Sequence, residues 1–168
     1  MQEDSSPPRT DASIAGVLVG EPDSRDVPAM LELLAELFRQ ERDFRPDPDK
    51  QLRALRLILA NPEKGHLFVA RTRGRVVGMA TVLSTVSTAE GGPVLLLEDV
   101  VVSASYRGEG IGRVLVDHLL QWAAEQGFLR VSLVTDADNH GAHRFYENLG
   151  FVPSEMRLFR RNLGSSPM

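Results

Sequence analysis

The chain has 168 residues, of which 42% are apolar and 25% are charged, with a net charge of −4 and no cysteine. These values are typical of one ordinary globular domain, and they exclude disulfides, thiolate metal sites and a cysteine nucleophile. The acidic balance argues against a nucleic-acid partner.

Residues 1–13 are rich in Ser, Pro and charge, which predicts a disordered N-terminal tail without the apolar core of a signal peptide. We expect the folded domain at 14–163 and a frayed C-terminus at 164–168. The chain has no apolar run of the roughly 18 residues that a membrane-spanning helix requires. We therefore expect a cytoplasmic protein with no membrane partner.

The first half of the chain predicts a strand, two helices and a β-hairpin. Apolar residues at helical spacing follow Asp23 and Ser24, either of which is a suitable N-cap, and Pro46 and Pro48 interrupt the pattern. Apolar strand-like runs on either side of a Gly-containing turn indicate the hairpin. The predicted elements are a strand at Ile14–Val19, a helix carrying Val27 to Phe38, a loop at Glu41–Pro48, a helix carrying Leu52 to Leu59, and strands at His66–Arg71 and Val76–Leu83 joined by Thr72-Arg73-Gly74.

The second half predicts a longer series of strands and helices. It comprises a polar loop at Ser84–Pro93, a strand at Val94–Val102, a helix from Ile111, a strand at Leu129–Thr135, a short helix ending near Leu149 and a last strand at Met156–Arg161. The two strands that flank the Ile111 helix should run parallel through a right-handed crossover, whereas the other strands pair as hairpins. The sequence therefore predicts an α/β fold with a mixed, mostly antiparallel central sheet and helices on both faces.

A glycine-rich turn lies between the Val94–Val102 strand and the Ile111 helix. Its sequence, from Tyr106 to Gly112, is Tyr-Arg-Gly-Glu-Gly-Ile-Gly. Backbone N–H groups at the start of a helix lack intrahelical partners and carry the positive end of the helix dipole, and glycines allow a phosphate to approach them. The turn lacks the Lys of a P-loop, and its glycine spacing is one residue short of the dinucleotide-binding fingerprint. It therefore predicts a pyrophosphate-binding loop of another kind.

Two ordered motifs resemble those of the GNAT superfamily of N-acetyltransferases. The first is Arg107-x-x-Gly110-x-Gly112, which is similar to the coenzyme A loop of that superfamily. The second, from Asn139 to Phe151, matches Asn-x-x-Ala-x-x-Phe-Tyr-x-x-x-Gly-Phe at every fixed position. The resemblance is clear from Leu95 to Phe159 and rests on pattern alone from Val17 to Leu83. It implies a GNAT fold, in which two neighbouring parallel strands splay apart and coenzyme A enters the gap.

The resemblance implies an N-acetyltransferase that uses acetyl-CoA as its co-substrate and a small-molecule or peptide amine as its acceptor. The amine would attack the thioester directly in a ternary complex. An alternative is a GNAT module that binds or senses acyl-CoA without turnover, and a third reading is another nucleotide-binding α/β protein. A homodimer is a further hypothesis, because members of the family commonly dimerise and Met156–Arg161 is a candidate edge strand.

The resemblance also implies which residues hold the cofactor. They are Val100, Val101, Val102, Arg107, Gly108, Glu109, Gly110, Ile111, Gly112, Asn139 and Tyr146. An N–H group of Val100 or Val102 would polarise the thioester carbonyl. Several of these residues also have a simpler alternative role. Arg107 could be a solvated loop residue, Asn139 a helix cap, and the three valines part of a buried strand.

Two residues are the candidate catalytic groups. Tyr146 is the candidate acid, because a phenol with a pKa of about 10 can donate a proton to a thiolate of similar basicity; the alternative is a tyrosine that only packs beside Phe145. Glu98 is the favoured base, since a carboxylate inside an apolar strand is costly without a partner or water access. By alternation Glu98 and Asp99 should face opposite sides of the sheet. Asp99, or a water chain without either carboxylate, is the alternative.

Two loops remain. The Glu41–Pro48 loop and the last predicted strand are the candidate walls of the acceptor site. Acids in the loop would attract a cationic amine and Arg45 would hold a carboxylate or phosphate, although the segment also reads as a plain solvated loop. Four potential metal ligands share one region near the second motif: Asp136, Asp138, His140 and His143. The resemblance places variable positions there, so we expect no metal.

Overall fold

The computed structural model describes residues 16–164. The predicted tail at 1–13 and the residues after 164 lie outside this range. Residue contacts divide the chain into two compact units, one ending at Leu133 and one beginning at Val134. None of the described helices is long and apolar enough to cross a membrane.

The first unit is built on a five-stranded sheet in the order β1-β2-β3-β4-β5. Its strands are β1 (Val17–Gly20), β2 (Gly65–Thr72), β3 (Arg75–Ser87), β4 (Gly92–Val102) and β5 (Val131–Leu133). Neighbouring strands are antiparallel except for β4 and β5, which are parallel. This confirms the predicted mixed, mostly antiparallel sheet.

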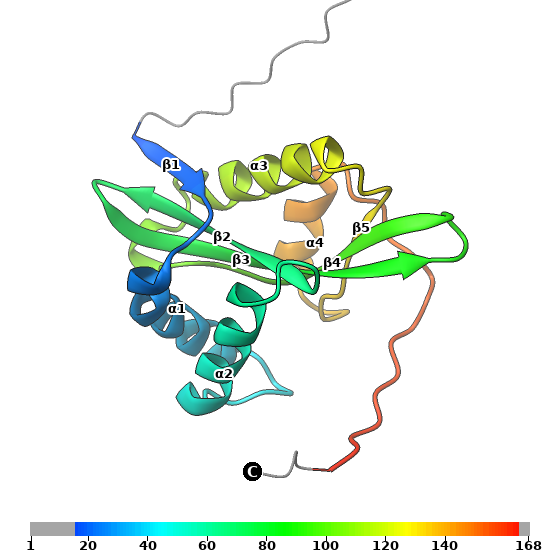
Figure 1. Ribbon diagram of the computed structural model, residues 1–168, viewed down its shortest axis with the longest axis horizontal. Helices are drawn as coiled ribbons and strands as arrows, with labels where there is room; N and C mark the ends of the chain where they lie inside the picture. Colours follow the sequence, from blue (N-terminus) through cyan, green and yellow to red (C-terminus); the bar gives the residue numbers. More distant parts are fainter. Residues whose placement is uncertain (1–15, 165–168) are drawn as a thin grey trace, which may run out of the picture. The chain divides into compact units, whose positions relative to one another are not determined.

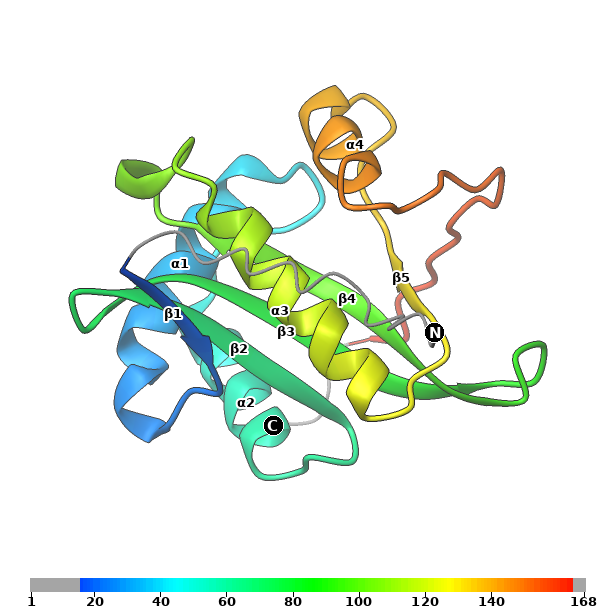
Figure 2. The same ribbon diagram turned by 90° about the horizontal axis from the view of Figure 1, so that it is seen from above.

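Helices cover both faces of this sheet (Figures 1 and 2). Helices α1 (Val27–Gln40) and α2 (Pro48–Leu59) pack on one face, and α3 (Ile111–Glu125) lies along the other. Short 3-10 turns precede α1 (η1, Ser24–Asp26) and follow β4 (η2, Ala104–Tyr106). As predicted, Asp23 begins the first helical segment: its side chain accepts a hydrogen bond from the Arg25 N–H at 2.7 Å.

Side chains alternate between the two faces of the sheet along each strand, so the same strands contribute apolar residues to the core on each face. On the α1 and α2 face, one apolar cluster joins helices and sheet: Met30, Leu33, Leu34, Leu55, Leu67, Val69, Met79 and Val101. On the other face, the Phe68 ring lies 5.1 Å from Trp122 of α3. Phe68 stands between Leu67 and Val69 in β2, so the period of two in this strand sends successive side chains to opposite cores.

The predicted polar loop at Ser84–Pro93 is wrong over most of its length. Strand β3 continues to Ser87 and β4 begins at Gly92, with Thr85 paired to Val94 and Val86 to Pro93. Val86 is 75% exposed, so this end of the hairpin has little apolar contact. A strand that is held by backbone pairing and solvated on its surface has the composition of a loop, which explains the error.

The second unit contains α4 (His140–Glu147), which confirms the predicted short helix. The chain then turns at Gly150, whose φ is +86°, and the Phe151 N–H donates to the Tyr146 carbonyl at 3.0 Å. The predicted strand at Met156–Arg161 is wrong, because these residues form neither helix nor strand. Met156 and Phe159 are each 89% exposed. A strand needs a neighbouring strand to satisfy its backbone, which an apolar pattern alone does not supply.

Candidate active site

A β-bulge interrupts β4 at its two carboxylates. Thr81 of β3 pairs with Asp99, whereas the next residue, Val82, pairs with Leu97. Glu98 is therefore the extra residue of the bulge, and the simple alternation that predicted opposite faces for Glu98 and Asp99 does not apply here. Bulges are common near functional sites because they redirect side chains and reset the direction of the backbone groups.

The bulge also turns a stretch of β4 backbone toward an open edge. Before it, the Leu95 N–H donates to the Arg130 carbonyl beside β5 at 2.8 Å. After it, the Ser103 N–H donates to Val77 of β3, also at 2.8 Å. Because N–H groups alternate along a strand, those of Val100 and Val102 point away from β3. Pairing with β5 ends at Leu97, so these two groups lie beyond the β4–β5 ladder.

The predicted pyrophosphate loop follows directly. Gly108 and Gly110 have φ values of +79° and +80°, which non-glycine residues rarely adopt, and a Cβ built on Gly108 would meet nothing within 4 Å. Gly110 is the N-cap of α3 and provides no side-chain hydrogen bond. The first N–H groups of this 15-residue helix therefore have neither an intrahelical partner nor a side-chain cap. An anion is well suited to this position.

The left-handed conformation of Gly110 gives a first testable expectation. Replacing Gly110 by Ala should lower stability by about 1 kcal/mol, because an L side chain is strained at this φ. For a chain of this size, that corresponds to a fall in melting temperature of about 2–4 °C. Gly112 lies inside α3, so Gly112→Ala is the control and should not lower the melting temperature. Equal losses for the two variants would contradict this account of the loop.

Arg107 is held by the protein rather than free in solvent. Its Nε donates to the Val102 carbonyl at 3.0 Å, and its Nη2 lies 3.7 Å from a carboxylate oxygen of Glu36 in α1. The same Glu36 oxygen accepts a hydrogen bond from the Ala104 N–H at 3.1 Å. Sequence reasoning missed Glu36, because a single glutamate on the polar side of an amphipathic helix carries no signal that separates it from a solvated residue.

The two carboxylates of the bulge differ in environment. Glu98 is exposed, whereas Asp99 is half-buried opposite Thr81. Burial raises the pKa of Asp99 from 3.8 to about 6, with smaller upward effects from the charges of Glu98 and Glu41. The Thr81 hydroxyl opposes this rise of the pKa. Asp99, the alternative that the sequence left open, therefore has a pKa suited to proton exchange near neutral pH.

The loop between α1 and α2 contributes to this electrostatic environment. The charge of Glu41 raises the Asp99 pKa, which places the start of this loop within electrostatic reach of β4. Phe44 packs against Phe38 of α1 with ring centroids 5.9 Å apart, and Asp47 caps α2 by accepting from the Lys50 N–H at 3.1 Å. Part of the predicted acceptor wall thus has a structural role. Its contact with an acceptor remains a prediction.

The remaining predicted residues belong to the second unit. The Asn139 side chain accepts from the Ala142 N–H at 3.0 Å and so caps α4, which was the simpler of its two predicted roles. The Tyr146 ring packs against Phe145 and Phe151, with centroid distances of 5.0 and 5.5 Å. The His143 ring bonds the Asp136 carbonyl at 2.9 Å. Within residues 16–164, no group of three His, Asp or Glu side chains is arranged to hold a metal ion.

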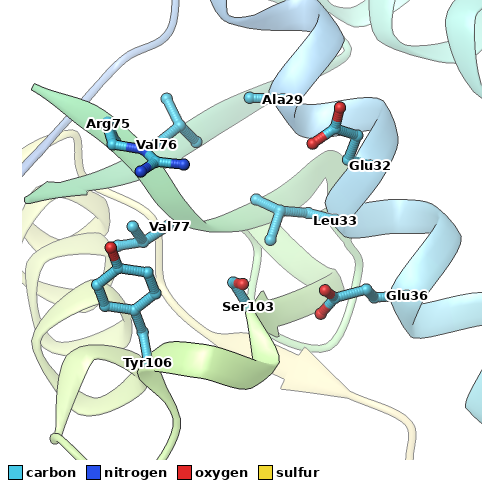
Figure 3. Close-up of a pocket in the computed structure, with 9 residues that line it drawn as sticks. All are labelled: Ala29, Glu32, Leu33, Glu36, Arg75, Val76, Val77, Ser103 and Tyr106. Atoms are coloured by element: carbon cyan, nitrogen blue, oxygen red, sulfur yellow. The ribbon is translucent and has the colours of Figure 1, made fainter.

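A small pocket lies beside the loop, between α1, β3 and η2 (Figure 3). Its volume is about 110 Å³. The lining residues are Ala29, Glu32, Leu33, Glu36, Arg75, Val76, Val77, Ser103 and Tyr106. None of them is a predicted cofactor-binding residue, so this pocket is distinct from the open edge of β4. Its wall nevertheless includes residues of both α1 and the segment that leads into the glycine loop.

Several known proteins with similar sequences are N-acetyltransferases. N-acetyltransferase family 8 member 2 of Rattus norvegicus is 37% identical over 87 residues, which cover 52% of this chain and 38% of the rat protein. Glucosamine 6-phosphate N-acetyltransferase of Trypanosoma brucei brucei is 33% identical over 93 residues, covering 55% of this chain and 61% of that enzyme. The chain thus spans less than two thirds of the length of both proteins.

A solved structure matches over a larger part of the chain. The crystal structure of a transcriptional regulator from Bacillus halodurans C-125 has a TM-score of 0.75 and 32% identity, and the match covers 87% of this chain and 99% of that one. Residues 27–151 match the acetyltransferase (GNAT) family. That span contains the bulge of β4, the glycine loop and the Asn139–Phe151 motif, so this chain belongs to the acetyltransferase (GNAT) family.

Proposed function

We propose that this protein transfers an acetyl group from acetyl-CoA to a primary amine by direct attack in a ternary complex. The observation that carries the proposal is the arrangement around β4. Beyond the bulge, the Val100 and Val102 N–H groups point to an edge that β5 does not pair, and the same strand leads into the uncapped start of α3. Backbone donors thus occur at this strand edge and again at the start of α3, an arrangement that suits an elongated ligand ending in phosphates.

The residues present fit such a ligand. Gly108 leaves open space where a side chain would stand, and the first N–H groups of α3 suit a pyrophosphate. The amide- and hydroxyl-containing arm of acetyl-CoA matches a free strand edge, which offers backbone donors and acceptors. Arg107 lies at this edge because its Nε is bonded to the Val102 carbonyl.

Each chemical task falls to a group of this chain. Acetyl-CoA supplies the thioester carbonyl that the amine attacks and the thiolate that leaves. The Val100 or Val102 N–H would donate a hydrogen bond to the carbonyl oxygen, where negative charge develops. Asp99 would accept a proton from the ammonium group of the acceptor, directly or through a water, because only the neutral amine attacks. The Tyr146 hydroxyl would give its proton to the departing sulfur.

We assign the base to Asp99 rather than to Glu98, the residue that the sequence favoured. A base with a pKa near 6 is largely ionised at neutral pH and still basic enough to accept a proton. Glu98 remains a prediction, and its position next to Asp99 makes it the natural comparison in every kinetic test.

Thiol release from acetyl-CoA tests the proposal when it is followed against a panel of amines. The panel should hold amino sugars, among them glucosamine 6-phosphate because of the trypanosome relative, together with polyamines, aminoglycosides, amino acids and peptides. We expect acetyl-CoA-dependent release with at least one member. The acetylated amine, identified by mass spectrometry, would name the acceptor class.

A thermal scan separates binding from turnover. Acetyl-CoA at about 100 times its dissociation constant should add roughly 2.7 kcal/mol and raise the melting temperature by several degrees. Stabilisation by ATP or NAD and not by acetyl-CoA would contradict the proposal. Stabilisation by acetyl-CoA without thiol release on any amine would favour the second candidate, an acyl-CoA-sensing module. The similarity to a protein described as a transcriptional regulator is the observation behind that candidate.

A further inference from the structure

We infer that Glu36 of α1 is a positioning residue for the acetyl-CoA loop, acting through the Ala104 N–H and the Arg107 guanidinium. The inference rests on the proposed function, since it assigns to Glu36 a role in acetyl-CoA affinity. Glu36 precedes Ala104 by 68 residues, so its hydrogen bond to the Ala104 N–H and its ion pair with Arg107 are tertiary links between the first helix and the segment that follows β4.

The links meet the segment at both ends of η2. The Ala104 N–H, at the start of the 3-10 turn, donates to Glu36 Oε2 at 3.1 Å. Arg107 follows the turn, and its Nη2 lies 3.7 Å from the same oxygen. Its Nε reaches back to the Val102 carbonyl at 3.0 Å. The Glu36 carboxylate, the Arg107 guanidinium and the end of β4 therefore hold both ends of η2. They thereby fix the position from which the chain continues into Gly108.

Helix α1 is a firm support for this carboxylate. Leu33 and Leu34 on the turn before Glu36 are each 4% exposed and belong to the core against the sheet. Residues 107–110 have no comparable anchor, because all four are exposed and the next buried residue is Ile111, at the start of α3. Glu36 thus transmits the rigidity of the core to a segment that has few apolar contacts.

Glu32 provides an internal comparison. It lies one turn before Glu36 on the same helix and lines the same pocket (Figure 3). Glu32 is exposed, and among residues 16–164 it makes no ion pair or side-chain hydrogen bond. The two glutamates share charge, helix and pocket, and only Glu36 contacts the loop. A difference between their variants therefore reports the contact rather than the local charge.

Two effects of removing Glu36 oppose one another. Its negative charge disfavours a phosphate nearby, but its hydrogen bond orders the backbone that would receive the phosphate. The side chains of Arg107 and Glu36 are 44% and 32% exposed, so solvent and salt screen their attraction. A hydrogen bond from a backbone N–H to a carboxylate is stronger than one between neutral groups, and it fixes the chain directly. We therefore expect the loss of order to dominate.

The experiment compares Glu36→Ala, Glu36→Gln and the control Glu32→Ala in the full chain. Glu36→Ala should raise the KM for acetyl-CoA about tenfold, the loss expected from one hydrogen bond to a charged group, with kcat within about twofold. Glu36→Gln keeps an oxygen that accepts from the Ala104 N–H, so its KM should stay within about threefold of the unaltered protein. Glu32→Ala should leave KM unchanged.

A truncated donor distinguishes positioning from general damage. S-acetylpantetheine keeps the thioester and lacks the pyrophosphate, so its kcat/KM should be equal for Glu36→Ala and the unaltered protein. A merely destabilised variant would lose activity with both donors, and melting curves identify that case. Equal acetyl-CoA affinity of Glu36→Ala and the unaltered protein, measured by calorimetry, would overturn the inference alone. Absence of acetyl-CoA binding to the unaltered protein would overturn the proposed function and the inference together.

Discussion

Replacing Asp99 by Asn should lower kcat/KM for the amine about 10²-fold, the usual contribution of a positioned general base. Asn is close in size to Asp and keeps a polar group opposite Thr81, but it cannot accept the proton of an ammonium group. The acceptor found with the amine panel would be used, with acetyl-CoA saturating, so that the loss reports the proton transfer and not the affinity for acetyl-CoA.

The pH profile is the more specific signature of this residue. In the unaltered protein, the Asp99 pKa of about 6 should appear as an acidic limb, with kcat/KM rising as pH passes upward through that value. The Asp99→Asn variant should lack this limb, and Glu98→Gln, the neighbouring control, should keep it. Loss of the limb in Glu98→Gln and not in Asp99→Asn would transfer the role to Glu98.

The free energy of unfolding should also change as Asp99 titrates, and the direction of its pKa shift determines whether stability rises or falls with pH. The Asp99 pKa is about 6 in the folded protein, above its ordinary value of 3.8, so the folded state binds the proton more tightly. The stabilisation from this proton is complete below the unfolded value and is lost as pH rises through about 6. The Asp99→Asn variant should therefore gain stability relative to the unaltered protein between pH 4 and pH 8. Urea unfolding at the two pH values measures the difference, and an unchanged difference would contradict the burial of Asp99.

The parts of the fold that the sequence predicts best are those where local signals agree. Asp23 begins the first helical segment, Arg73 and Gly74 adopt the positive φ of a tight hairpin turn, and the apolar face of α3 is buried as expected. Each of these features depends on residues close together in the chain. The extension of β3 and β4 past Ser84 and the absence of a strand at Met156–Arg161 depend on pairing partners, which composition does not reveal.

The candidate site divides in the same way. Its glycine loop is readable because Gly108 and Gly110 must adopt left-handed backbone conformations that few other residues accept. The environment of the two carboxylates cannot be predicted from the sequence. A bulge at Glu98 changes which side chain is buried, and no residue pattern in the apolar strand indicates that bulge. Glu36 contacts the segment before the loop only because α1 packs on the sheet, so no local sequence pattern identifies it.

Replacing Tyr146 by Phe is the other change with a large expected effect, a fall in kcat of about 10²-fold. Phe keeps the ring that packs against Phe145 and Phe151 and removes only the hydroxyl, so the fold of α4 and the KM for acetyl-CoA should change little. The chain has two tyrosines, and Tyr106→Phe removes the other hydroxyl as a matched control. That control should keep its kcat, because Tyr106 lines the pocket beside η2 and has no assigned chemical role.

The leaving group shows whether the lost hydroxyl acts as an acid. An acetyl thioester of a more acidic thiol needs less help from a proton donor, so the ratio of kcat between the unaltered protein and Tyr146→Phe should shrink with such a donor. If Tyr146 only packs or orients, the ratio should be the same for both thioesters. An undiminished kcat for Tyr146→Phe with acetyl-CoA would show that Tyr146 is not the acid. Proton donation to the sulfur would then fall to water, and the role of Asp99 as the base could still be tested separately.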